Sequence, residues 1–126
     1  MDALRRALGL LSVVYLLAFV CFGLSHAGVA LGPLRQPVIV PAVIVELLCA
    51  AAMLTGAVGA LTGRAWGWDG LIYTHAGALA GVLLGIMAVA FRGDGESALL
   101  SWYHGTIATL LAAGLAGAFY VSRVRR

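Results

Sequence analysis

The amino-acid sequence predicts an all-α fold, a four-helix antiparallel transmembrane bundle with the N-terminus and the C-terminus both in the cytoplasm (N-in/C-in). Hydrophobic residues make up 63% of the 126-residue chain, charged residues make up only 10%, and the mean hydropathy is +1.03. Four apolar stretches each approach the ~20 residues that a helix needs to cross a bilayer. Short connectors join them, so we expect a single integral membrane domain, residues 1–126, with the lipid bilayer as its surroundings.

The first expected span covers residues 7–25 and follows a pair of arginines. A basic start, an apolar run and the small residues of Ser25-His26-Ala27 are also compatible with a cleavable secretory signal. The apolar run is longer than a typical signal core, so we expect an uncleaved helix. Gly32-Pro33 and Pro37 then break the chain.

The second, third and fourth spans are expected at residues 38–62, 70–91 and 98–121. Pro41 falls in the first turns of the second span, where the missing N–H group costs least. Asp69 is placed to cap the third span, and residues 94–97 supply cap candidates for the fourth. Aromatic residues near the span ends, among them Trp102 and Tyr103, are typical of the belts at membrane interfaces.

The arginines predict the orientation. Six of them (Arg5, Arg6, Arg64, Arg123, Arg125 and Arg126) fall on the side that holds both termini, and two (Arg35 and Arg92) fall on the opposite side. Because positive residues are enriched on the cytoplasmic side, both termini are predicted to be cytoplasmic. Lys and Asn are absent from the chain, and this composition is typical of a GC-rich bacterial genome, so we expect a multi-pass protein of the bacterial inner membrane.

Small residues recur at every fourth position in three of the spans. Gly77, Gly81 and Gly85 form such a stripe in the third span, Gly105 and Gly117 belong to one in the fourth, and Gly56 belongs to one in the second. Small residues let helix backbones approach closely within lipid. We expect these glycines to pack the helices of the chain against each other, with a homo-oligomer interface as the alternative use.

Glu46 is a lone carboxylate in the middle of an apolar span, and His26 and His104 are expected in the same outer half of the membrane. A charge within a bilayer costs about 2.5–3.5 kcal/mol on insertion scales, so such residues usually have a partner or a task. These three residues form the candidate ligand-binding or proton-linked site. Three interpretations remain open: a hydrogen-bonded acid that ties helices together, a binding or redox-linked site, and a transport site.

Several other chemistries find little support. His75 and His104 enter from opposite sides, so haem b ligation by two histidines is not favoured. The two cysteines do not form a zinc motif, and the arginines are not clustered as a nucleic-acid surface requires. Phosphate-binding loops and nucleophile elbows are absent, so the sequence offers no catalytic residues, and we expect no catalysis by the chain alone.

Glu46-Leu47-Leu48, the small-residue run to Gly56, and Arg64 at the helix end resemble the second span of DoxX-like membrane proteins. Gly23-Leu24-Ser25-His26 resembles the end of that family's first span. Cys49-Ala50 departs from the family's usual glycine pair, and the arginine-rich C-terminus departs from its usual tail. The resemblance implies a small four-span protein, in some members a subunit of quinone-linked sulfur oxidation or of a membrane oxidoreductase assembly.

Two classes of function therefore remain open. One is a non-catalytic or redox-accessory subunit in which Glu46 contacts a quinone or stabilises a membrane-associated oxidoreductase partner. The other is a small oligomeric transporter or lipid- or solute-binding protein with Glu46 in a cavity.

Overall fold

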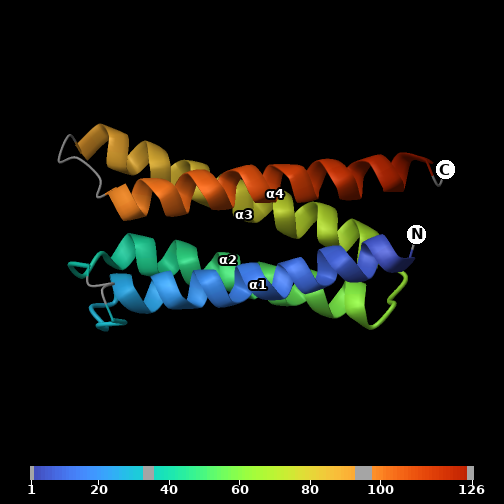
Figure 1. Cartoon of the computed structure of the whole chain (residues 1–126), viewed down its shortest axis with the longest axis horizontal. Helices are drawn as coiled ribbons and strands as arrows, with labels where there is room; N and C mark the ends of the chain where they lie inside the picture. Colours follow the sequence, from blue (N-terminus) through green and yellow to red (C-terminus); the bar gives the residue numbers. More distant parts are fainter. Residues whose placement is uncertain (1, 33–35, 93–97, 125–126) are drawn as a thin grey trace.

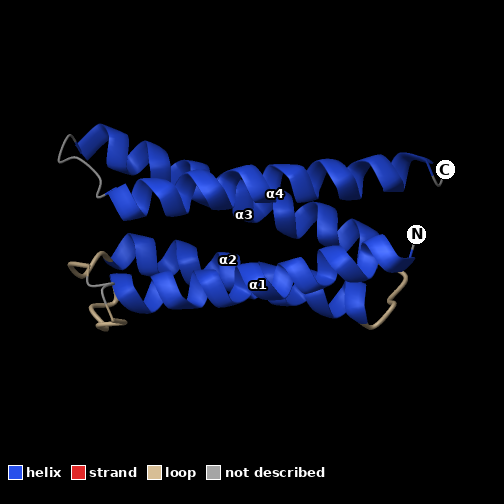
Figure 2. Ribbon diagram, in the orientation of Figure 1, coloured by secondary structure: helices blue, strands red, loops and turns tan. Residues whose placement is uncertain are grey.

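The computed structural model describes residues 2–32, 36–92 and 98–124, which form four α-helices (Figure 2). These are α1 (Asp2–His26), α2 (Val40–Leu61), α3 (Gly67–Arg92) and α4 (Ala98–Val124). Each contains a stretch long and apolar enough to cross a membrane. The chain thus has the composition and helix lengths of a multi-pass membrane protein, as its sequence predicts.

The helix ends differ from the expected spans in ways that have local causes. α1 begins at Asp2 instead of residue 7, and α4 runs on to Val124, because polar and basic residues continue a helix beyond its apolar core. α3 begins at Gly67, so Asp69 lies inside its first turn and is not the cap. A carboxylate there still interacts favourably with the free N–H groups of the helix start. The cap candidates at residues 94–97 lie outside the described residues.

α2 begins and ends at features that can be read from its sequence. Pro41 stands in its first turn. At the other end, Gly63 adopts a φ of 70°, which a residue with a side chain rarely takes. The N–H of Arg64 then donates to the carbonyl oxygen of Gly59 over an N–O distance of 3.1 Å. This is the Schellman arrangement that ends many helices, and it turns the chain toward α3.

Both chain termini lie at one end of the molecule, which we call the termini end, and the α1–α2 connector lies at the opposite or far end (Figure 1). Contacts are most extensive between helices that follow each other in sequence, whereas α1 meets α3 and α4 much less. α3 crosses the molecule: it lies against α2 near the termini end and beside α4 toward the far end (Figure 1). α1 and α2 therefore separate from α3 and α4 toward the far end.

Glycines and a tryptophan hold α2 and α3 together near the termini end. A Cβ atom added at Gly56 would collide with the Thr74 hydroxyl, and one added at Gly67 would lie 2.7 Å from the carbonyl oxygen of Gly59. The Trp66 ring covers Gly59 itself. Below them, a core cluster combines buried side chains of all four helices: Leu8, Ala60, Trp68, Leu71, Ala118 and Val121.

The glycine stripes divide into packed and open positions. Added Cβ atoms at Gly56, Gly81 and Gly85 would each meet a side chain of another helix. At Gly77, Gly105 and Gly117, an added Cβ would meet no atom of another described segment within 4 Å. The use of these last three glycines in helix packing therefore stays a prediction, because the described residues of one chain place no neighbour against them. The i, i+4 period shows that they share a helix face, but it carries no information about what lies opposite that face.

Candidate functional site

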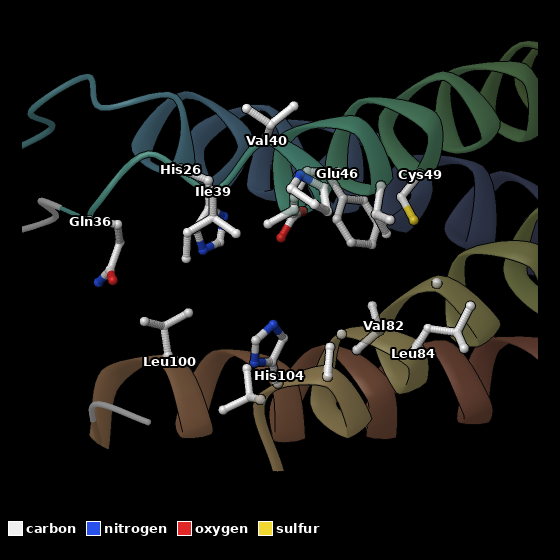
Figure 3. Close-up of a pocket in the computed structure, with 18 of the residues that line it drawn as sticks. His26, Gln36, Ile39, Val40, Glu46, Cys49, Val82, Leu84, Leu100 and His104 are labelled. Atoms are coloured by element: carbon white, nitrogen blue, oxygen red, sulfur yellow. The ribbon is translucent and has the colours of Figure 1, made fainter. Parts of the chain in front are cut away.

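A cavity of about 900 Å³ lies between the two helix pairs in the half of the molecule near the far end (Figure 3). All four helices and the segment before α2 contribute to its lining. His26, Glu46 and His104, the three residues that the sequence singles out, all line it. Apolar side chains make up most of the remaining wall, which is the usual composition of a small-molecule site.

Glu46 is buried on α2 and accepts a hydrogen bond from the Tyr103 hydroxyl of α4, with an Oη–Oε2 distance of 2.8 Å. The Tyr103 ring stacks on Phe22 of α1, with centroids 3.4 Å apart and planes 12° from parallel. Gly23 allows α1 to approach the base of the Glu46 side chain, since a Cβ there would lie 3.3 Å from the Glu46 Cβ. Tyr103 thus connects α4 with both α1 and α2, and it orients one oxygen of the carboxyl group.

The two histidines approach the cavity from different helices. His26 is the last residue of α1 and is buried, and His104 is buried in the second turn of α4. Figure 3 places His26 and Glu46 on one wall of the cavity and His104 on the facing wall. Gly85 of α3 lies beside the His104 ring: an added Cβ would sit 3.7 Å from Nε2, an ordinary van der Waals distance. Gln36 adds an amide to the lining from the segment that leads into α2.

The cavity continues away from these polar groups into an apolar region. Cys49 lies one turn after Glu46 on α2, and Figure 3 shows it with Val82 and Leu84 on the side away from Gln36. The thiol of Cys49 lies 3.9 Å from the carbonyl oxygen of Ala78. A Cβ at Gly81 would come within 2.8 Å of the same sulfur, so Gly81 is where α3 closes onto α2. The lining therefore changes from polar to apolar along its length.

His75 does not line this cavity; it forms a separate buried pair with Tyr15. Its Nδ1 lies 2.8 Å from the carbonyl oxygen of Leu71, and its ring meets that of Tyr15 edge to face at 5.8 Å. A Cβ at Gly114 would come within 2.8 Å of the imidazole, so α4 fits closely over it. The imidazole is therefore enclosed by neighbours from α1, α3 and α4.

Sequence reasoning placed Tyr103 with Trp102 in an interfacial belt and did not identify it as the partner of Glu46. Trp102 is exposed, whereas Tyr103 is buried. A signal was present: Tyr103 precedes Ile107 and Leu111 by one and two helical turns, so it shares their buried face. Sequence reasoning considered Cys49 only in relation to a zinc motif, and the structure places it in the cavity wall.

The polar groups around the cavity can hold a ligand by hydrogen bonds. The carboxyl oxygens accept, and imidazole and amide groups both donate and accept. Within residues 2–32, 36–92 and 98–124, no three His, Cys, Asp or Glu side chains lie together as a metal site requires. Comparison of the chain with protein-family models, curated proteins and solved structures finds no match.

Proposed function

We propose that this chain is a small multi-pass protein of the bacterial cytoplasmic membrane that binds a membrane-soluble molecule in the cavity around Glu46. In this proposal its helices form an antiparallel transmembrane bundle with both termini in the cytoplasm, as the six arginines on that side favour. The far end then faces the cell exterior, and the cavity occupies the outer half of the bilayer.

One observation carries the binding proposal: a cavity of about 900 Å³ collects Glu46, His26 and His104 on otherwise apolar walls. If Glu46 served only to hold helices together, its hydrogen bond to Tyr103 would be sufficient. That structural role would not explain the large cavity beside the carboxyl group. A few polar groups in an apolar cavity are what a ligand with a polar head and a hydrophobic body requires.

The resemblance to DoxX-like proteins gives the proposed role, a non-catalytic or redox-accessory subunit. A quinone has two carbonyl oxygens, which imidazole N–H groups at His26 or His104 would bind, and an isoprenoid chain that the apolar walls would accommodate. The chain would present or hold the quinone for an oxidoreductase partner in the membrane.

A second candidate is an oligomeric transporter or lipid- or solute-binding protein. The open glycine positions favour it, because Gly77, Gly105 and Gly117 are left without a helix neighbour in the described part of a single chain. Small residues on an exposed helix face permit close contact with a second copy. In that assembly the cavity would form part of a transport pathway and would not be a closed binding site.

The test is to purify the full-length chain in mild detergent, extract its bound lipids, and identify them by mass spectrometry and redox difference spectroscopy. We expect a stoichiometric quinone or other neutral lipid, and a several-fold lower amount with Glu46→Gln, which keeps the shape of the side chain but changes its charge. Glu46→Leu should lose at least as much. A matched control is Thr55→Val, on the exposed side of the same helix, whose hydroxyl bonds only to its own helix. Equal lipid content in all four proteins would refute the binding proposal.

A further inference from the structure

The walls of the cavity differ in their exposure, and this difference locates its opening. The lining residues from α1 and α4 are all buried: Phe19, His26, Leu100 and His104. In contrast, Val40 of α2 and Leu84 of α3 line the cavity and are 60% and 61% exposed. Pro37 and Val38, in the segment that leads into α2, also line the cavity and are exposed. The side formed by α1 and α4 is therefore closed, and the cavity opens between α3 and α2 with the segment before it.

The geometry of α2 and α3 explains this opening. They touch near the termini end, where Gly56 faces Thr74 and Gly67 meets the Gly59 carbonyl, and they meet once more at Gly81. Beyond that contact, α3 diverges to run beside α4 while α2 stays beside α1 (Figure 1). The two helices form a wedge that widens toward the far end, and the cavity fills the wide part.

The opening faces the surroundings that lipid chains occupy. Its exposed rim residues include Val40, Leu84 and Ala88, which are apolar and belong to helices of bilayer-crossing length. The polar groups Glu46 and His104 lie deeper, on the buried walls. A molecule in this wedge would thus have its polar head against the back wall and its apolar part directed outward between α2 and α3.

The charges around the cavity limit the kind of head group. No arginine is among the described lining residues, and the chain contains no lysine. Among these described lining residues, a phosphate would therefore lie close to the Glu46 carboxyl with no arginine or lysine to neutralise it, which is costly in an apolar site. Carbonyl and hydroxyl groups, in contrast, find donors and acceptors in the imidazoles, the carboxyl group and the Gln36 amide.

We propose that the cavity receives a neutral lipid with a small carbonyl- or hydroxyl-bearing head, and that this lipid enters sideways from the bilayer between α2 and α3. The inference rests on the proposed function, because it specifies the ligand and the route for the same cavity. Long-chain quinones and diacylglycerols share the required head chemistry, so both serve as probes.

The experiment uses the full-length protein in lipid nanodiscs with three photoactivatable probes: a long-chain quinone, a diacylglycerol, and a phosphatidic acid with the same acyl chains as the diacylglycerol. Crosslinked peptides are mapped by mass spectrometry. We expect at least one neutral probe to label α2 and α3 around the cavity, and the phosphatidic acid to label those peptides about fivefold less. Of the two neutral probes, the quinone or the diacylglycerol, the one that labels the cavity more strongly identifies the class of lipid that binds. Equal labelling by phosphatidic acid would overturn the neutral-head assignment.

Ala88→Trp tests the route, since Ala88 is exposed at the rim of the opening, and Ala90→Trp is its control, exposed on the same helix but outside the cavity lining. We expect only Ala88→Trp to reduce cavity labelling several-fold. Leu84→Trp and Leu83→Trp form a second rim and control pair if Ala88→Trp does not fold. If rim and control variants label alike while Glu46→Gln loses labelling, sideways access is wrong and the binding proposal stands. If no neutral probe labels the cavity of the parent protein, both proposals fail.

Discussion

The hydrogen bond between Tyr103 and Glu46 provides the sharpest test of how the helices are held together at the far end. Tyr103→Phe removes only the hydroxyl group and keeps the ring, so the stacking on Phe22 at 3.4 Å should survive. The lost bond is a buried one of 2.8 Å, directed at a carboxyl group.

The expected magnitude follows from the kind of bond. Hydrogen bonds between membrane helices contribute on average about 0.6 kcal/mol, and bonds to charged groups in proteins contribute ~1.5–3 kcal/mol. We therefore expect Tyr103→Phe to lower the free energy of unfolding by about 1 kcal/mol. Tyr103→Ala should cost more, about 3 kcal/mol or above, because it also leaves the space of the buried ring empty.

The assay is a double-mutant cycle of Tyr103→Phe and Glu46→Leu, with unfolding followed in mixed micelles by circular dichroism. Leucine is chosen because a glutamine oxygen would still accept the bond. Residues in direct contact show coupling of about 0.5–3 kcal/mol, whereas independent sites add within ~0.3–0.5 kcal/mol. Tyr73→Phe is the matched control, because Tyr73 is 76% exposed. Additive effects of the two site variants would show that Tyr103 does not hold Glu46, and the account of the site would fail.

Three further predictions concern packing and topology. Gly81→Leu should lower the free energy of unfolding in detergent by about 1–3 kcal/mol, because the leucine would overpack against Cys49. Gly77→Leu, on the same helix but with open space around it, should change the free energy of unfolding little. Equal melting profiles of the two variants would refute this difference. Gly56→Ala should also destabilise the protein by displacing the Thr74 hydroxyl, and adding Thr74→Ala should restore part of the loss in the same melting assay. A phosphatase reporter fused after residue 126 should be inactive and a fluorescent reporter there active, because that terminus is predicted to be cytoplasmic; the reverse pattern would overturn the orientation.

The number and type of the helices could be predicted from the sequence because they depend on local properties. In lipid, backbone N–H and C=O groups must bond within the segment, so an apolar stretch of sufficient length becomes a helix whatever surrounds it. The glycine after α2 and the proline near its start also act locally, through their own backbone angles. Glu46 could be singled out for the same reason, since the cost of a carboxylate in an apolar span does not depend on the fold.

The relative rotation and tilt of the helices determine three features of the site. They determine which residue bonds to Glu46, where the cavity opens, and which glycines contact another helix. Those angles follow from side chains far apart in sequence: Tyr103 reaches Glu46 because Phe22 supports its ring, and α3 diverges because Gly56 and Gly81 set where it touches α2. Periodicity places Gly77 and Gly81 on nearly the same face, yet among the described residues another helix lies against Gly81 and none against Gly77. A stripe of small residues on one helix face can be recognised from the sequence of that helix alone. Whether this face contacts lipid or another helix depends on where the other helices pack, because lipid and protein are both apolar surroundings for it.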